Sequence, residues 1–136
     1  MPWRANTPTY GFSPDDASSH PWLPQPTTWA SLSAEAQAAD PASMLNLYRS
    51  ALRIRPAILG DESMQWLDRG VDVLAFRRGD RFECVVNLGA EPVAIPEQSE
   101  ILLASGELAE RAVPTDTAVW LRIERYPTLT EVETSR

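Results

Sequence analysis

The chain has 136 residues, of which 43% are apolar and 23% are charged, and its formal net charge is −7. These proportions are ordinary for one globular domain that buries a real core. The acidic balance argues against nucleic acid as a partner and against an anionic membrane surface, because both are bound through clustered basic residues. All twelve Lys/Arg positions are arginine, which excludes a lysine nucleophile or Schiff base.

The single Cys84 and the single His20 limit the chemistry further. One cysteine excludes an internal disulfide and a multi-cysteine metal site, and one histidine excludes a histidine-rich metal site. His20 lies in a Ser-Ser-His-Pro stretch without a nucleophile motif, so we expect a surface side chain. We expect no metal ion and no cofactor. No segment approaches the roughly 20 apolar residues of a membrane span, and the first residues lack the apolar run of a signal peptide, which predicts a cytoplasmic protein.

The first forty residues have the composition of an ordered loop rather than of a regular helix or strand. They hold six of the twelve prolines and three of the five tryptophans, Trp3, Trp22 and Trp29. Proline fixes the backbone and lacks a hydrogen-bond donor. Indole rings stack on sugars as well as filling cores, so Trp22 and Trp29 either anchor the loop or contact a ligand. A short helix is expected at residues 33–39.

One long helix is predicted next. We expect Asp40 to cap it, Pro41 to occupy its first position and Pro56 to end it. Its apolar residues recur at helical spacing over a wide face, which predicts a well-buried helix. They are Met44, Leu45, Leu47, Tyr48, Ala51, Leu52 and Ile54.

The stretch from about residue 64 to 124 predicts short strands. Alternating apolar residues on both sides of a Gly79-Asp80 turn indicate a hairpin of residues 71–76 and 81–88. Further strands are expected at 64–67, 92–95, 101–104 and 118–123. About six strands at this spacing favour an antiparallel β-sandwich, with Trp66, Cys84 and Trp120 in its core. Residues 127–136 are expected to form a flexible tail.

The neighbouring acids of the chain do not predict a catalytic pair. Glycoside hydrolysis needs two carboxyl groups across a sugar, and one of them needs a raised pKa. Asp15-Asp16 and Asp61-Glu62 are neighbours in predicted turns, where carboxylates are solvated. We therefore expect no catalytic residue in this chain.

Several motifs follow one another in a recognisable order: Met1-Pro2-Trp3, Tyr10-Gly11-Phe12, Trp22-Leu23-Pro24, and then residues 35–49, 72–77 and 85–89. In this order they resemble one region of the bacterial α-glucosidases of the α-amylase superfamily, the oligo-1,6-glucosidase and maltase group. In that group a Pro-Met-Pro-Trp or Pro-Met-Gln-Trp motif follows the last barrel strand. A Gly-Phe and a Trp-Leu-Pro come next, followed by the eighth barrel helix.

The resemblance implies an α+β fragment. Residues 1–60 would be a remnant of the catalytic barrel, with its last loop and eighth helix, and residues 61–126 a C-terminal β-sandwich domain. The family's catalytic Asp, Glu and second Asp lie upstream of the matched region, so the chain is expected to be inactive alone. Met1 falls on the internal methionine of the family motif. Trp3, Phe12 and Trp22 would lie near the substrate at the barrel mouth.

The leading functional hypothesis is a C-terminal, non-catalytic part of an α-glucosidase-like glycoside hydrolase, which supports the barrel in an enzyme of carbohydrate metabolism. Its partner would be the missing barrel portion of the parent enzyme or a separately encoded barrel, and α-glucosides would be the ligands. The alternatives are a free-standing carbohydrate-binding module and an accessory subunit. Neither nucleic acid nor a membrane is an expected partner. The uncovered helix face predicts that the isolated chain self-associates.

Overall fold

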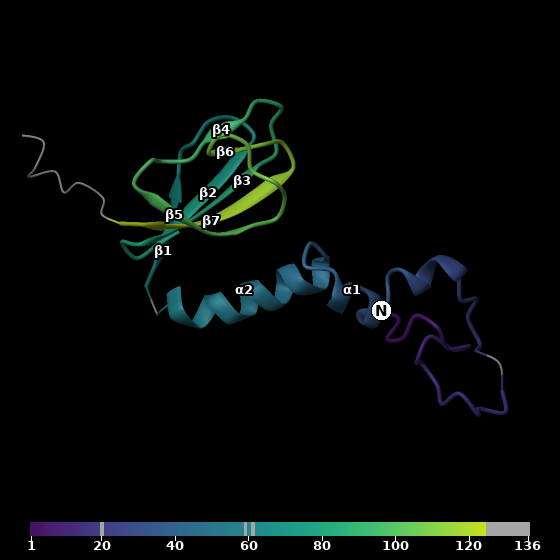
Figure 1. The fold of residues 1–136 in the computed structure, drawn as a ribbon. Coiled ribbons are helices and arrows are strands. Elements are labelled where there is room, and N and C mark those ends of the chain that lie inside the picture. Colours follow the sequence, from purple (N-terminus) through teal and green to yellow (C-terminus); the bar gives the residue numbers. More distant parts are fainter. Residues whose placement is uncertain (20, 59, 61, 125–136) are drawn as a thin grey trace, which may run out of the picture. The chain divides into compact units, whose positions relative to one another are not determined.

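The computed structural model describes residues 1–19, 21–58, 60 and 62–124 (Figure 1). The chain divides into two compact units, an N-terminal unit of Met1–Ala51 and a C-terminal unit of Leu52–Arg136. The division falls inside the long helix, whereas the predicted domain boundary at residue 60 stays a prediction. His20 and the predicted tail, residues 127–136, lie outside the described residues.

The N-terminal unit contains the 3-10 helix η1 (Thr27–Ala30), the short helix α1 (Ala34–Ala39) and the first half of α2 (Met44–Ile58). The predicted helix at 33–39 is confirmed, and Ser33 caps it by accepting a hydrogen bond from the Ala36 N–H at 3.2 Å. Among the described residues no helix has the length and apolar character needed to cross a membrane.

The predicted start of α2 at Asp40 and Pro41 is wrong. The Asp40 carboxylate accepts a hydrogen bond from the Ala42 N–H at 2.9 Å, which folds the segment into a turn instead of a first helical turn. Ser43 takes the capping position, where its hydroxyl oxygen accepts from the Asn46 N–H at 3.3 Å. An aspartate can cap a helix or close such a local turn with equal ease, and here the second arrangement forms.

The end of α2 and its burial also differ from expectation. Pro56 lies inside the helix, which continues to Ile58. Pro56 has no N–H to donate to the Leu52 carbonyl, four residues before it. Leu52 is exposed, so water can donate to that carbonyl instead. The helix contains no buried residue, and Met44, Tyr48 and Leu52 are each about 60% exposed or more. The prediction of a well-buried helix is therefore wrong.

The C-terminal unit is an antiparallel sandwich of two unequal sheets, as predicted. The larger sheet has the strand order β1-β2-β3-β7-β5, and the smaller one pairs β4 with β6 (Figure 1). Their bounds are Met64–Leu67 for β1, Val73–Arg78 for β2, Phe82–Asn87 for β3, Val93–Ala94 for β4, Ser99–Ala104 for β5, Ala112–Val113 for β6 and Thr117–Ile123 for β7. The two-residue strand β6 was not expected, because so short a segment carries no alternation.

The core lies on one face of the larger sheet. Its buried apolar residues come from the larger sheet and from the segments of the smaller one, and they are Ala75, Val85, Ile95, Val113, Val119, Leu121 and Ile123. Val85 shares this face with the polar Glu83 and Asn87, since side chains two residues apart on a strand point the same way. This geometry leaves Phe82, Cys84 and Val86 on the opposite face of β3.

The β2–β3 hairpin forms as predicted, but its connection includes Arg81 as well as Gly79 and Asp80, because Arg78 lies opposite Phe82 across the ladder. Gly79 has φ +58, a left-handed conformation that glycine adopts without strain. The first strand of the hairpin begins at Val73 and not at Val71. Asp72 has φ +60, which breaks the extended conformation, and Val71 is 89% exposed.

Candidate functional site

The N-terminal loop doubles back on itself and so brings together residues that are far apart in the sequence. The Tyr10 carbonyl accepts hydrogen bonds from the Trp3 N–H at 2.8 Å and the Arg4 N–H at 3.1 Å. Gly11 has φ +77, and a Cβ atom placed there would lie 3.0 Å from the Trp3 Cβ. Glycine at this position therefore permits both the turn and the close approach of the two backbone segments.

This fold of the loop creates a hollow of about 460 Å³ between the two segments. Trp3 and Phe12 both line the hollow and are 57% and 47% exposed. The structure thus brings together two of the three residues that the sequence placed near a substrate. Trp22 does not line the hollow and is 97% exposed.

Phe12, which lines the hollow, also belongs to a small aromatic cluster with Trp29 and Tyr10. The Trp29 ring lies 5.9 Å from the Phe12 ring and 6.3 Å from the Tyr10 ring, in tilted and edge-to-face geometry. Such pairs stabilise each other beyond simple burial. Trp29 thus packs on two rings of its own loop, whereas Trp22 is 97% exposed, and whether either residue contacts a ligand stays a prediction.

Polar groups at the rim of the hollow are Arg4 and Asp15, whose nearest charged atoms, Nη1 and Oδ2, are 3.9 Å apart. Sequence reasoning treated Asp15 as an ordinary turn residue and did not single out Arg4. Aromatic faces beside a charged hydrogen-bonding pair suit a sugar, which offers an apolar ring face and an edge of hydroxyl groups. In the part of the chain that the structure describes, no group of three His, Cys, Asp or Glu residues is placed to hold a metal ion.

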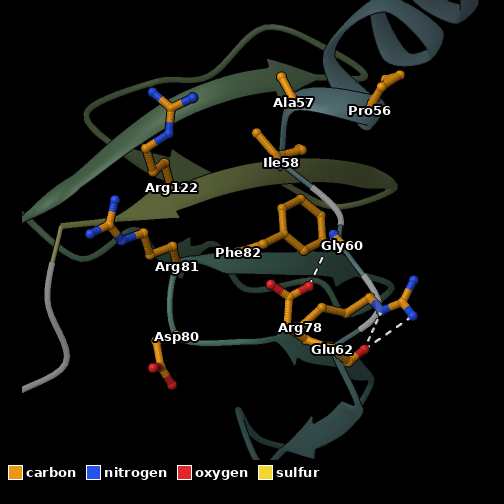
Figure 2. A pocket seen from close by; sticks show the side chains of 10 residues that line it. All are labelled: Pro56, Ala57, Ile58, Gly60, Glu62, Arg78, Asp80, Arg81, Phe82 and Arg122. Atoms are coloured by element: carbon orange, nitrogen blue, oxygen red, sulfur yellow. Dashed lines mark hydrogen bonds between the residues drawn. The ribbon is translucent and has the colours of Figure 1, made fainter.

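A larger hollow of about 750 Å³ lies within the C-terminal unit, beside the β2–β3 turn (Figure 2). Phe82 stands in the middle of the view, and Pro56, Ala57 and Ile58 of the last turn of α2 line the opposite side. The sequence did not predict this hollow, because it depends on how the end of α2 lies against β3, which is more than twenty residues further along the chain.

Three arginines border this larger hollow. Arg78 donates two hydrogen bonds to the Glu62 backbone carbonyl, at 3.2 and 3.3 Å, and Arg122 pairs with Glu100 at 2.5 Å. Arg81 forms no ion pair with any described residue and is exposed. Arg81 and Arg122 point to the same side of the hollow in Figure 2.

Cys84 lies on the same face of β3 as Phe82 and is buried, as predicted. It lies on the face opposite the core cluster, however, and so do Trp66, which is 64% exposed, and the half-buried Trp120. The predictions that Trp66 and Trp120 are core residues are therefore wrong, and Cys84 is buried but lies outside the core cluster. Burial raises the pKa of the Cys84 thiol to about 11, the nearby Glu83 charge raises it too, and a hydrogen bond with Trp120 partly offsets them. This thiol is not an activated nucleophile.

Comparison with known proteins gives one domain family and two informative structures. Residues 57–120 match the family model DUF3459, described as a domain of unknown function. DUF3459 is the C-terminal domain of α-amylase-family enzymes. The crystal structure of the alpha-glucosyl transfer enzyme XgtA is 26% identical, with a TM-score of 0.63, and the match covers 91% of this chain and 25% of that chain.

Eubacterium rectale Amy13B is 15% identical with a TM-score of 0.51, over 69% of this chain and 22% of that chain, which is a likeness of fold alone. No curated protein sequence matches the chain. The chain spans about a quarter of the length of the two solved structures. It is thus similar to the C-terminal domain of α-amylase-family glycoside hydrolases.

Proposed function

We propose that this chain is the C-terminal, non-catalytic part of an α-glucosidase-like glycoside hydrolase of carbohydrate metabolism, acting in the cytoplasm. Its role is to support the catalytic barrel and to complete the rim of the substrate entrance. The observation that carries the proposal is the likeness to XgtA, which extends over 91% of the chain and so includes both compact units. The loop motifs around Trp3 and Trp22 favour the oligo-1,6-glucosidase and maltase group.

The apolar face of α2 supports the assignment of residues 1–60 to a barrel. Met44, Tyr48 and Leu52 are spaced four residues apart, so they form one stripe along the helix, and all three are exposed. Arg49 and Arg53 lie on the other side of the helix. A helix with one apolar stripe in water is the form that the eighth barrel helix would take without its neighbouring strands.

Trp3, Phe12 and Trp22 are the residues that we assign to the substrate entrance. Trp3 and Phe12 present partly exposed rings in one hollow, and Arg4 and Asp15 supply hydrogen-bonding groups beside them. Their contribution is to bind a sugar ring and not to cleave it. The catalytic carboxylates and the protons that they move belong to the barrel.

The proposal is tested by mixing this chain with a truncated XgtA, from which the quarter that matches this chain has been removed. We expect the two pieces to form a stable complex that hydrolyses an aryl α-glucoside, while this chain alone releases no aglycone. Trp3→Ala should raise KM in that complex and leave its assembly unchanged, and Leu32→Ala, another exposed apolar residue outside the hollow, is the matched control. Absence of any complex contradicts the proposal.

A free-standing carbohydrate-binding module is the second candidate, because Trp22 is 97% exposed and an exposed indole is a stacking platform. This candidate predicts that the isolated chain binds maltotriose, with a change in tryptophan fluorescence that Trp22→Ala abolishes. The leading proposal predicts no saturable binding by the chain alone, since the entrance is completed only with the barrel. One titration therefore separates the two candidates.

A further inference from the structure

The strand register places two arginines on either side of Phe82, at one end of the larger sheet. Arg78 of β2 and Arg122 of β7 are the cross-strand partners of Phe82. Side chains that lie opposite each other in a ladder point to the same face of the sheet. All three side chains accordingly line the larger hollow of the C-terminal unit. The sheet thus holds two guanidinium groups beside one hollow.

Arg81, the last residue before β3, adds a third guanidinium group to this hollow. It is exposed, and it forms no ion pair with any residue that the structure describes. In Figure 2 its side chain and that of Arg122 point to the same side of the hollow. The whole chain carries a net charge of −7, so two arginines on one side of a hollow form a basic site on an acidic protein.

Two acidic residues line the same hollow, and neither occupies its basic side. The Glu62 carboxylate accepts a hydrogen bond from the Gly60 N–H at 3.0 Å and stands apart from the guanidinium groups of Arg81 and Arg122 in Figure 2. The Asp80 carboxylate points away from both arginines in the same view. The hollow therefore has a basic side and, separate from it, a carboxylate that can accept hydrogen bonds.

The ion pair of Arg122 with Glu100 does not prevent Arg122 from binding a ligand. The two side chains are 43% and 55% exposed. Ion pairs between exposed side chains contribute little to stability, because water already solvates both charges. A guanidinium group also carries five N–H donors, more than one carboxylate can accept. Arg122 can therefore bind an anion in addition to Glu100 or in its place.

The size and the lining of the hollow suit a small molecule with an apolar face. Its volume is about 750 Å³, and sites for small molecules measure roughly 300 to 1,000 Å³. Pro56, Ala57 and Ile58 of the last turn of α2 form an apolar wall opposite Phe82 (Figure 2). A hydroxylated ring offers an apolar face to such a wall and hydroxyl groups to the Glu62 carboxylate. The two arginines require in addition that the molecule carries an anionic group.

A phosphate group matches two arginines better than a carboxylate does. Each guanidinium group presents a planar fork of N–H donors. A carboxylate has two oxygens and one negative charge, so a single fork already engages both of its oxygens. A phosphate monoester has three terminal oxygens and close to two negative charges at neutral pH. It can therefore accept hydrogen bonds from Arg81 and Arg122 together.

We propose that this hollow binds the phosphate monoester of a small hydroxylated molecule, such as a phosphorylated sugar. Arg81 and Arg122 bind the phosphate, Glu62 accepts a hydrogen bond from a hydroxyl group, and the last turn of α2 packs on the apolar face of the ring. All the lining residues belong to the C-terminal unit. The site therefore does not depend on the proposed function. When bound, the ligand joins the end of α2 to the sheet.

The test is a calorimetric titration of the full chain with glucose 6-phosphate at low ionic strength. We expect saturable binding that weakens as salt is added, because salt screens the charges. Arg81→Gln and Arg122→Gln should each raise the Kd about tenfold or more, as loss of a charge-assisted hydrogen bond does. The matched control is Arg49→Gln, which removes the same charge from an exposed arginine that does not line the hollow and should leave the Kd unchanged.

Two further compounds test the parts of the ligand. Inorganic phosphate lacks the hydroxylated ring, and glucuronate carries a carboxylate in place of the phosphate. We expect both to bind more weakly than glucose 6-phosphate. Inorganic phosphate that binds as tightly would overturn the assignment of a hydroxylated ligand, and glucuronate that binds as tightly would overturn the choice of a phosphate group.

A second measurement is the midpoint of thermal unfolding. A ligand that binds only the folded chain raises this midpoint. Glucose 6-phosphate should raise it for the unchanged chain and for Arg49→Gln, but not for the double variant Arg81→Gln/Arg122→Gln. An unchanged chain that shows no saturable binding, or a double variant that binds as tightly as the unchanged chain, overturns the proposal and leaves the proposed function standing.

Discussion

Glu83 and Asn87 are fully buried polar side chains of β3, and each is satisfied by specific partners. The Asn87 side-chain amide donates to the Glu91 and Val113 carbonyls, both at 2.9 Å, so it joins the larger sheet to a strand of the smaller one. Glu83 accepts a hydrogen bond from Arg69 at 2.5 Å. Removing one partner of such a buried polar group lowers the free energy of unfolding, because the group that remains has neither its partner nor water to bond to.

The Arg69–Glu83 pair therefore predicts a large effect of a single substitution. Arg69→Ala should lower the free energy of unfolding by about 3 kcal/mol, since it removes the Arg69 cation from a carboxylate that is fully buried. Urea denaturation measures this value. Arg122→Ala is the matched control: its pair with Glu100 is exposed on both sides, so we expect a loss below about 1 kcal/mol. Equal losses in the two variants would show that burial of Glu83 does not set the cost.

Cys84 predicts a specific dependence of stability on pH. Its pKa is raised from the ordinary 9.0 to about 11 in the folded chain, chiefly by burial. Between these values the unfolded thiol ionises while the folded thiol keeps its proton, so the free energy of unfolding falls as pH rises. Well below pH 9.0 the thiol is neutral in both states and contributes no slope.

The measurement is the free energy of unfolding from pH 8 to about 11 for the unchanged chain and for Cys84→Ala. The two proteins differ at this one side chain, so the difference between the two curves reports Cys84 alone. We expect the unchanged chain to lose stability relative to the variant above pH 9.0. Parallel curves over the whole range would contradict the assignment of a raised pKa to this thiol.

The same residues show where sequence reasoning reached its limit on β3. Alternation correctly predicted a strand with two kinds of face, and it placed Phe82, Cys84 and Val86 on the apolar one. The core cluster in fact lies on the side of Glu83, Val85 and Asn87. A pattern of hydrophobicity cannot identify which face meets the core when a buried ion pair and a buried amide make the core-facing side look polar.

Helix α2 is tied to α1 by polar contacts at its beginning. The Ser43 hydroxyl donates to the Gln37 carbonyl at 2.7 Å and accepts from the Asn46 N–H. The Asn46 side-chain amide donates to the Gln37 and Asp40 carbonyls, at 3.0 and 2.8 Å. The side chains of Ser43 and Asn46 thus satisfy carbonyl groups at the end of α1, and Ser43 also satisfies an N–H group in the first turn of α2. These contacts fix the corner between the two helices.

The Ser43 contacts predict the effect of removing one hydroxyl group. Ser43→Ala should lower the free energy of unfolding of the helical part by about 1 kcal/mol, because a capping acceptor is lost. Circular dichroism at 222 nm during urea titration follows the helices. Ser50→Ala makes the same change in the middle of the same helix, where alanine is the better helix former, so it should be neutral or slightly stabilising. A cost in Ser50→Ala equal to that in Ser43→Ala would contradict the capping role.

At this scale the sequence predicted the elements better than their ends. The presence of both helices was predicted, that of α2 from the spacing of its apolar residues. The exact start of α2 depended on a competition between Asp40 and Ser43 for the same local hydrogen bonds, and several N-terminal caps were compatible with the pattern. Strands β1, β3, β5 and β7 were predicted within about two residues of the observed bounds, a usual margin for assigned ends.

For the whole molecule, the order of the parts was predictable and the surfaces were not. A loop rich in proline and tryptophan, one main helix and an antiparallel sandwich follow one another as expected. The hollow between Trp3 and Phe12 depends on the left-handed turn at Gly11. The row of aromatic rings from Trp66 to Trp120 depends on the register in which the strands pair. Both features arise from contacts between distant segments, which a periodicity within one window does not contain.

The central claim is that these residues act as the C-terminal, non-catalytic part of an α-amylase-family enzyme. The most direct measurement is to isolate, with an antibody against this chain, the protein that carries it in the source cells, and to determine its mass and peptides. We expect either one polypeptide of about four times the mass of this chain, as for XgtA, or a tight complex with a separate catalytic barrel. A lone protein of 15.1 kDa with no barrel bound would contradict the account.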